Sequence, residues 1–301
     1  MSRESFVELL KCKDVKYDEK YDISRFSTVR IGAREFTVFP KSQQELICCL
    51  DYLEDNREKY TVVGAMSNTL ARSDGYGGVI ICTSMLDSWS LNANTVTLSA
   101  GCRIARVAPI LADVGLSGFE ELVGIPGYVG GLVYGNAGAF ARSISDVLLS
   151  AEIYDTATRR VMTFSREEMK FSYRRSILSE NRALILISAT LGGFEKRGRD
   201  EILKKISDCA ARRREAQPLE YPSLGSVFKR PAVGYAGAYI EDAGLKGYSV
   251  GGATVSKKHA GFIINSGGCT SDDFISLLEY VQRTVFERYG VLLEREVEYL
   301  Q

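Results

Sequence analysis

The alternation of apolar and polar positions predicts a chain built from both strands and helices. Alternating or continuous apolar runs bounded by Gly, Pro or polar clusters are typical of strands. The predicted strands are residues 28–32, 35–39, 60–63, 78–82, 95–100, 149–154, 161–164, 183–188, 258–265 and 291–300. Apolar residues at helical spacing predict helices that begin near residues 42, 104, 199 and 270, and short helices after 165 and before 244.

Two of these helices carry clear end signals. Ser42 and Glu45 have the spacing of a capping box, in which each side chain accepts from the other residue's backbone N–H. The last helix begins at Thr270 or Ser271 and should stop at Gly290, because glycine readily takes the left-handed conformation that ends a helix.

Composition places the chain among ordinary globular proteins and excludes some partners. It has 45% hydrophobic and 25% charged residues, and 38 basic residues balance 38 acidic ones. This balance gives no support for a nucleic-acid or membrane partner. Seven scattered cysteines fit reduced thiols. The polar N-terminal residues predict no signal peptide, so we expect a cytoplasmic protein.

An uncharged, glycine-rich stretch stands out at residues 123–141, where six residues are glycine. Such a stretch exposes backbone N–H groups without side-chain bulk, as a cradle for an anionic cofactor requires. A membrane span is the weaker alternative, because the glycines, Pro126 and Asn136 make it too polar. A tight turn without a ligand is the other alternative.

Several common sites are absent from the sequence. It has no Gly-x-Gly-x-x-Gly fingerprint and no Gly-Lys pair of a phosphate-binding loop. The single histidine, His259, lies beside Lys257 and Lys258 and fits a loop edge better than a triad base. No metal site is expected. What remains are two Gly/Ser/Asn loops, 64–68 and 124–136, which could together hold the diphosphate and ribityl chain of a flavin dinucleotide.

The order of motifs along the chain resembles the UDP-N-acetylenolpyruvoylglucosamine reductase family. The motifs begin at Thr28 (Thr-Val-Arg-Ile-Gly), Gly64 (Gly-Ala-Met-Ser-Asn), Gly124 (Gly-Ile-Pro-Gly-Tyr-Val-Gly-Gly), Asn136 (Asn-Ala-Gly-Ala), Tyr173 (Tyr-Arg-Arg-Ser), Gly225 (Gly-Ser-Val-Phe-Lys) and Leu293 (Leu-Glu-Arg-Glu-Val). They run through nearly the whole chain, which resembles the variant with a short third domain. Ala65 and Met66 depart from the family pattern, which usually has more glycine there.

The resemblance implies the fold, the cofactors and the reaction. The expected class is α+β: a two-part FAD-binding α/β unit of the PCMH type and a smaller substrate domain. The expected segments are 1–82, 83–200, 201–290 and a returning strand at 291–301. The family uses non-covalent FAD and NADPH to reduce an enolpyruvyl ether on a UDP-sugar to UDP-N-acetylmuramate, in bacterial cell-wall synthesis. The first loop has no histidine for covalent attachment of FAD, and no partner protein is implied.

The resemblance also assigns residues to the site. The implied FAD contacts are Arg30, Gly64, Ser67, Asn68, Gly124, Ile125, Pro126, Gly127, Gly130, Gly131, Asn136 and Gly138. The implied substrate contacts are Tyr173, Lys229 and Asn265, although Tyr173 could instead belong to the core.

Three further residues are implied in the chemistry. Hydride addition to the enolpyruvyl methylene carbon builds negative charge on the carbon next to the carboxylate, which needs a fixed cation or acid nearby. Arg174 can bind a carboxylate at two points. Glu296 can stabilise the same group if protonated, or orient Arg174 if ionised, and Glu294 is the alternative should the register differ. Ser226 is the expected proton donor.

For each of these three residues, an ordinary structural or solvent-exposed role remains the alternative. A Gly-Ser pair is ordinarily a turn, Arg174 beside Arg175 is ordinarily solvated, and Glu296 lies on a polar face with its neighbours. Two other functions also stay open: another FAD-dependent sugar or alcohol oxidoreductase on the same scaffold, and a flavin-binding relative without turnover.

Overall fold

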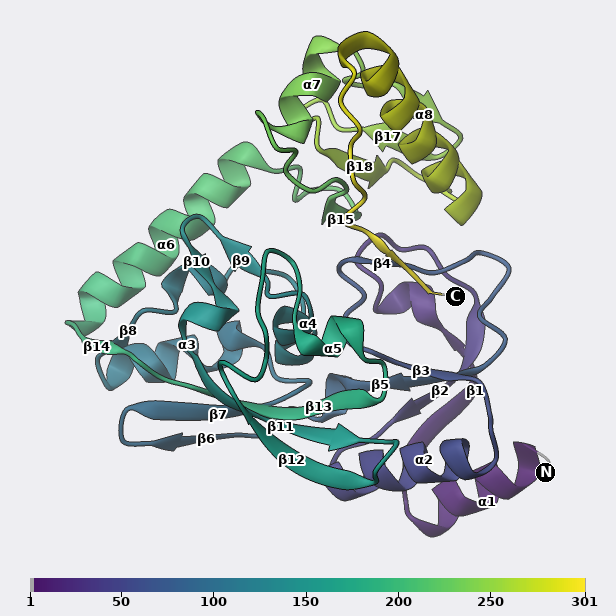
Figure 1. The fold of residues 1–301 in the computed structure, drawn as a ribbon, viewed down its shortest axis with the longest axis vertical. Helices are drawn as coiled ribbons and strands as arrows, with labels where there is room; N and C mark the ends of the chain where they lie inside the picture. Colours follow the sequence, from purple (N-terminus) through teal and green to yellow (C-terminus); the bar gives the residue numbers. More distant parts are fainter. Residues whose placement is uncertain (1–2, 301) are drawn as a thin grey trace. The chain divides into compact units, whose positions relative to one another are not determined.

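The computed structural model describes residues 3–300 and separates the chain into two compact units (Figure 1). Unit 1 holds the residues up to Glu19, then Phe36–Ala65 and Gly78–Ala211, and unit 2 holds Lys20–Glu35, Met66–Gly77 and the residues from Arg212 on. Both units combine helices with sheets, which confirms the α+β class. The four-segment division expected from the sequence stays a prediction. Met1 and Ser2, in the stretch where no signal peptide was expected, and Gln301 lie outside the described residues.

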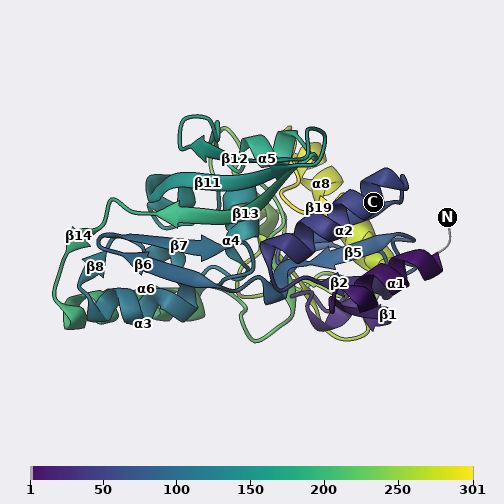
Figure 2. The same ribbon diagram turned by 90° about the horizontal axis from the view of Figure 1, so that it is seen from below.

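The first sheet of unit 1 has four strands in the order β1-β2-β5-β3. Their bounds are β1 Lys16–Asp22, β2 Arg34–Phe39, β3 Tyr60–Val63 and β5 Val79–Cys82, and β5 is parallel to both of its neighbours. Helices α1 (Arg3–Cys12) and α2 (Gln43–Asp55) run along this sheet (Figure 2). Phe6, Leu10 and Leu50 of these helices pack in one core with Phe36 and Val38 of β2.

The second sheet of unit 1 has five antiparallel strands in the order β12-β11-β13-β7-β6. They are β6 Trp89–Asn92, β7 Thr95–Ser99, β11 Leu148–Asp155, β12 Arg160–Ser165 and β13 Leu184–Leu191. The helices of this part are α3 Ile104–Asp113, α4 Val129–Tyr134, α5 Ile177–Glu180 and α6 Arg199–Ala216. Ile104, Val107 and Leu111 of α3 share a core with Val133 of α4 and the strand residue Leu98.

Short elements complete unit 1. They are the pair β8 Leu116–Ser117 with β14 Glu195–Lys196, the hairpin β9 Gly138–Ala139 with β10 Arg142–Ser143, and the 3-10 turns η2 Thr83–Met85, η3 Glu120–Leu122 and η4 Ile144–Asp146. Turn η3 leads directly into the glycine-rich stretch.

Unit 2 is a four-stranded antiparallel sheet, β15-β18-β17-β16, with two helices. Its elements are η1 Ile23–Arg25, β15 Ser223–Ser226, α7 Ala236–Asp242, β16 Ser249–Val250, β17 Ala253–Val255, β18 Phe262–Asn265 and α8 Ser271–Tyr289. Strand β19 (Glu298–Tyr299) pairs in parallel with β4 (Thr69–Leu70). The core contains Leu277 and Val281 of α8 together with Leu293 and Val297 of the C-terminal segment.

The end signals of the two long helices are largely confirmed. Ser42 caps α2 by accepting from the Glu45 N–H at 3.2 Å, although the Glu45 carboxylate accepts from Lys41 rather than from Ser42. Thr270 and Asp273 form a complete capping box on α8, which ends at Gly290 with φ 67°. Glycine adopts that left-handed conformation without the cost that a Cβ adds.

Several element predictions are wrong. Residues 28–32 form no strand, because Arg30 has φ 60° and its N–H bonds the Ser27 carbonyl in a turn. Residues 165–168 exchange cap-like hydrogen bonds but close only a turn. The long last strand reduces to β19 and one bridge, Phe228 to Arg295. Helices α1 and α4 were missed.

Candidate functional site

The glycine-rich stretch of unit 1 is held against the second sheet by its backbone. The Val129 N–H donates to the Cys102 carbonyl at 2.9 Å, and the Gly130 N–H donates to the Ala100 carbonyl at 2.8 Å. A Cβ on Gly130 would lie 3.1 Å from that same Ala100 oxygen, a tight contact that glycine avoids where the two backbones approach.

The two predicted loops meet within unit 1. A Cβ on Gly64 would lie 3.2 Å from Cδ2 of Tyr128, which places the start of the first loop against the glycine-rich stretch. The Arg103 guanidinium lies 5.1 Å from the centre of the Tyr128 ring and covers it. Gly131, by contrast, is exposed, and a Cβ there would meet no other atom within 4 Å. Close-packed backbone beside an open, uncharged surface is what a flavin diphosphate cradle requires, so these residues fit FAD.

We predict that Gly131→Ala keeps the fold and weakens FAD binding. Alanine favours a helix interior over glycine by about 1 kcal/mol, so α4 itself loses nothing. If the open side of Gly131 receives the cofactor, the added methyl group should raise the FAD dissociation constant at least about tenfold, or ~1.4 kcal/mol. Flavin fluorescence titration of the apoprotein measures this constant. Gly198→Ala, whose Cβ also meets nothing within 4 Å, is the control. Unchanged FAD affinity in Gly131→Ala would remove Gly131 from the cofactor site.

A buried carboxylate anchors the turn that precedes the glycine-rich stretch. Glu120 is fully buried and accepts from the Ser117 hydroxyl at 2.6 Å and from the Gly118 N–H. Burial raises the pKa of Glu120, but these hydrogen bonds and Lys205, 3.4 Å away, outweigh it and leave the pKa below its ordinary value. The ionised carboxylate therefore fixes η3, and the Ile125 N–H bonds the Leu122 carbonyl at the end of that turn.

Asn136 connects the glycine-rich stretch to the turn that carries Arg174. Its buried amide donates to the Ser172 carbonyl at 2.9 Å and accepts from the Ser145 N–H at 3.3 Å. The Ser176 hydroxyl donates to the Tyr134 carbonyl at 2.8 Å, which ties the same turn to the end of α4. The Asn136 side chain thus fixes the turn at residues 172–175 by hydrogen bonds within the protein.

Arg174 is held in a conformation that non-glycine residues avoid. Its φ is 58°, in the left-handed region, where a residue with a Cβ costs on the order of 1 kcal/mol or more. Its half-buried guanidinium lies 5.3 Å from the centre of the exposed Tyr173 ring. The tight turn closed by the Ser172–Arg175 bridge holds Arg174 in this conformation.

Gly138 has a packing role of its own. A Cβ on this residue would lie 2.7 Å from the Arg142 carbonyl across the β9–β10 hairpin, so only glycine fits there.

In unit 2, Ser226 and Glu296 belong to neighbouring extended segments. The Glu296 N–H donates to the Val227 carbonyl at 2.9 Å, and the Lys229 N–H donates to the Glu294 carbonyl at 2.8 Å. Ser226 is exposed at the end of β15, and Glu296 is half-buried. The backbone beside Ser226 therefore pairs with the backbone of Glu296, although the two residues lie seventy positions apart in the chain.

Asn68 joins this pair from the first loop. Its side-chain amide donates to the Glu296 carbonyl at 2.9 Å, and its own carbonyl accepts from the Glu298 N–H at 2.9 Å. The residue predicted to contact FAD thus also fixes the backbone of a predicted catalytic residue.

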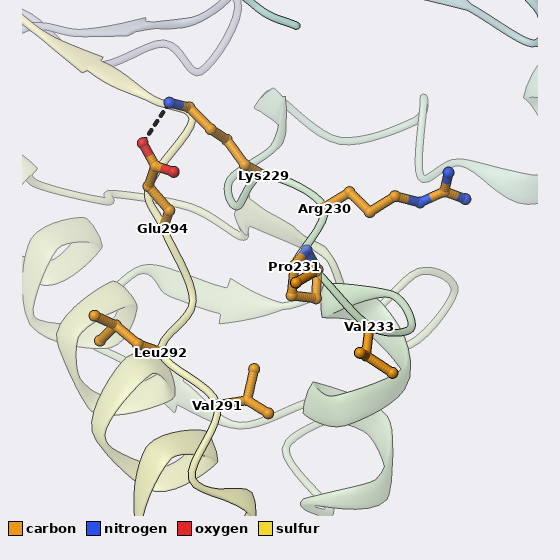
Figure 3. Close-up of a pocket in the computed structure, with 8 residues that line it drawn as sticks. Lys229, Arg230, Pro231, Val233, Val291, Leu292 and Glu294 are labelled. Atoms are coloured by element: carbon orange, nitrogen blue, oxygen red, sulfur yellow. Dashed lines mark hydrogen bonds and ion pairs between the residues drawn. The ribbon is translucent and has the colours of Figure 1, made fainter.

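A cavity of about 360 Å³ opens beside Lys229 (Figure 3). Its lining is apolar at Val233, Val291 and Leu292 and charged at Lys229, Arg230 and Glu294, with Pro231 and Ala232 completing it. The Lys229 ammonium lies 2.5 Å from the Glu294 carboxylate, and the Lys229 side chain is 18% exposed, whereas Arg230 stacks over Tyr235. A lysine ammonium at the edge of a cavity suits a phosphate group.

Other predicted residues of unit 2 have local partners. Asn265 donates to the Val29 carbonyl at 3.0 Å and accepts from the Gly267 and Cys269 N–H groups, so it orders the loop that follows β18. Exposed Arg30 donates to the Arg25 carbonyl, and Ser67 is half-buried. His259 accepts from the Gly261 N–H through Nδ1, and burial lowers its pKa, so it is a neutral residue of a packed loop.

The predicted residues therefore form two sets. Unit 1 contains Gly64, Gly124, Ile125, Pro126, Gly127, Gly130, Gly131, Asn136, Gly138, Tyr173 and Arg174. Unit 2 contains Arg30, Ser67, Asn68, Ser226, Lys229, Asn265 and Glu296. Sequence reasoning missed Glu120, and its position two residues after Gly118, just before the stretch, was the available signal.

Within residues 3–300 no cluster of His, Cys, Asp and Glu could hold a metal ion. In the same part of the chain no helix is both long and apolar enough to span a bilayer.

Comparison with known proteins identifies the family of the chain. Residues 217–300 match the family described as UDP-N-acetylenolpyruvoylglucosamine reductase, C-terminal domain, and residues 35–165 match the FAD binding domain family. The UDP-N-acetylenolpyruvoylglucosamine reductase of Caldicellulosiruptor bescii is 42% identical over 98% of this chain and 94% of its own length. The enzyme of that name from Caldanaerobacter subterraneus subsp. tengcongensis is 40% identical over 92% of this chain and 91% of its own.

A solved structure gives the same result. The crystal structure of UDP-N-acetylenolpyruvylglucosamine reductase from Thermus caldophilus matches with a TM-score of 0.80 and 28% identity, over 95% of this chain and 99% of that one. The sequence and the fold agree, and the chain belongs to the UDP-N-acetylenolpyruvoylglucosamine reductase family of FAD-dependent oxidoreductases.

Proposed function

We propose that this protein uses NADPH to reduce UDP-N-acetyl-3-O-(1-carboxyvinyl)-glucosamine to UDP-N-acetylmuramate, a step of peptidoglycan synthesis in the cytoplasm. The observation that carries this proposal is the backbone pairing of the segments that hold Ser226 and Glu296, because it brings two predicted catalytic residues into neighbouring segments. The strained Arg174 supplies a permanent cation.

The glycine-lined surface of unit 1 would hold the cofactor. The glycines Gly64, Gly124, Gly127 and Gly131 add no side-chain bulk, and Gly131 leaves its side open. Bound FAD would supply hydride-transfer chemistry between NADPH and the substrate. Ser67 and Arg30 are proposed as further contacts to it.

The side chains would handle the charge that develops on the substrate. Hydride addition at the methylene carbon moves the electron pair of the double bond to the carbon next to the carboxylate. Arg174 would bind that carboxylate at two points and stabilise the charge as it spreads onto the oxygens. Glu296 would stabilise the same region or orient Arg174.

Ser226 would complete the reaction by donating its hydroxyl proton to that carbon. A serine hydroxyl is a weak acid, but the carbanion is a strong enough base to take its proton. Because Ser226 is exposed, the resulting alkoxide can recover a proton from water or a neighbouring acid. Lys229 would bind the substrate diphosphate from the edge of the cavity, with Tyr173 and Asn265 as further substrate contacts.

The test is the fate of hydrogen in the product. Turnover in D₂O with unlabelled NADPH should place solvent deuterium on the carbon beside the carboxylate. Mass spectrometry and NMR of the isolated UDP-sugar would measure this. Consumption of oxygen with a sugar or alcohol, and no reduced UDP-sugar, would favour the rival oxidase function.

A further inference from the structure

The C-terminal segment carries three glutamates at two-residue intervals, Glu294, Glu296 and Glu298. In an extended segment, alternate side chains project to the same side. A shift of this segment by two residues would therefore bring a different glutamate to the place opposite Val227 that Glu296 now occupies. The glutamates alone cannot specify which of them acts there.

The other side of the segment carries a sequence that does not repeat. Leu293, Arg295 and Val297 alternate with the glutamates, and Leu293 and Val297 are buried in the core of unit 2. A shift by two residues would force the Arg295 guanidinium into one of these apolar positions, where an unpaired charge is very costly. Register is therefore determined on this side.

Arg295 is fastened to α8 and to the end of its own segment. Its Nε donates to Gln282 Oε1 at 2.9 Å, and its Nη1 donates to the Tyr299 hydroxyl at 3.0 Å. Nη2 also approaches Glu279 at 3.1 Å, but that carboxylate is 57% exposed, so solvent weakens this ion pair.

Gln282 holds the same segment a second time. Its Nε2 donates to the Leu293 carbonyl at 2.6 Å while its Oε1 accepts from Arg295. One side chain of α8 thus contacts both the backbone before Glu294 and the guanidinium before Glu296. With Arg295 held on the α8 side, the alternation places Glu294 and Glu296 on the opposite side, and Glu294 there meets Lys229 (Figure 3).

We propose that Arg295, held by Gln282, is a positioning residue that selects Glu296 among the three glutamates to act with Ser226. This inference rests on the role of Glu296 in the proposed function. Arg295 contacts neither substrate nor cofactor in this account, and it acts only through the register and direction of its neighbour.

The test compares Arg295→Met and Arg295→Lys with Arg283→Met, which removes an exposed arginine of α8, next to Gln282. Arg295→Met should retain FAD and lower kcat about tenfold with little change in KM, because a displaced carboxylate loses transition-state stabilisation rather than substrate binding. Arg295→Lys should recover part of kcat, since lysine can still reach Gln282 at one point. Arg283→Met should have the wild-type kcat.

A double substitution gives the sharper signature. In the wild-type background, Glu296→Gln should lower kcat strongly. In the Arg295→Met background, Glu296 is already displaced, so Glu296→Gln should lower kcat by a smaller factor. The effects of the two substitutions on kcat should therefore not be additive. Additive effects, or a wild-type kcat in Arg295→Met, would overturn the inference. A wild-type kcat in Glu296→Gln alone would instead refute the role of Glu296.

Gln282→Met provides a second route should Arg295→Met fail to fold. It removes the hold on the segment from the helix side and should give the same fall in kcat. Loss of folding in both variants would show that the contacts are structural and would overturn the positioning role.

Discussion

Replacing Ser226 by alanine should leave the protein folded and loaded with FAD, and should lower turnover with the enolpyruvyl UDP-sugar by about 10²- to 10⁴-fold, the range in which a positioned acid contributes. The loss should fall on kcat, because the hydroxyl acts on a charge that exists only after hydride addition. Steady-state NADPH oxidation measures the effect, and the flavin spectrum reports cofactor content.

The control for this prediction is Ser249→Ala. Ser249 is an exposed residue of β16 in the same sheet, and its hydroxyl bonds only near neighbours, Gly247 and Thr254. It should have the wild-type kcat. A Ser226→Ala variant with wild-type turnover would remove the proton-donor assignment, and one that loses FAD would show that Ser226 has a structural role.

The second large effect is expected at Gly101, between β7 and α3. A Cβ there would lie 1.7 Å from the Thr83 carbonyl oxygen and 2.8 Å from the Leu86 carbonyl oxygen. The residues on either side, Ala100 and Cys102, accept the hydrogen bonds that hold Val129 and Gly130. Gly101→Ala must therefore shift backbone, and we expect it to cost about 3 kcal/mol or more of unfolding free energy and to release FAD.

Chemical denaturation of Gly101→Ala and wild-type protein would measure the difference. Gly198→Ala is the matched glycine change in open space, and it should cost at most about 1 kcal/mol, the usual effect at a helix N-cap. If Gly101→Ala were as stable as Gly198→Ala, the close approach of these backbones would be wrong.

Local patterns predicted the parts of the fold in which local and long-range preferences agree. Helix α8 combines an apolar stripe, a capping box and a terminal glycine, and all three features appear as expected. The strand predicted at 28–32 failed because Val29 and Ile31 alternate into the core from a turn. The burial of every second residue is the pattern expected of a strand, but Arg30 between them has a left-handed backbone conformation.

Helix α1 was missed although Phe6 and Leu10 lie at helical spacing. Two apolar contacts in a polar segment are a weak local signal, and packing against Phe36 and Tyr52 completes the helix. Tertiary contact, rather than propensity, decides such a segment.

Some features of the candidate site could likewise be predicted from local sequence, and others could not. The glycine-rich stretch was visible in composition, because an uncharged run with six glycines is unusual in a globular protein. Ser226, Arg174 and Glu296 could be chosen only by resemblance, because each is an ordinary surface residue in its local sequence. The contact of Arg295 with Gln282 could not be foreseen at all, since it depends on how α8 packs against the C-terminal segment.

The most direct test of the central claim follows NADPH absorbance after the purified protein receives the enolpyruvyl UDP-sugar. The account predicts little oxidation before the UDP-sugar is added, then oxidation in proportion to it, with UDP-N-acetylmuramate as the product. Two results would contradict this function: a rate of NADPH oxidation that does not depend on the UDP-sugar, or no NADPH oxidation by protein that carries FAD.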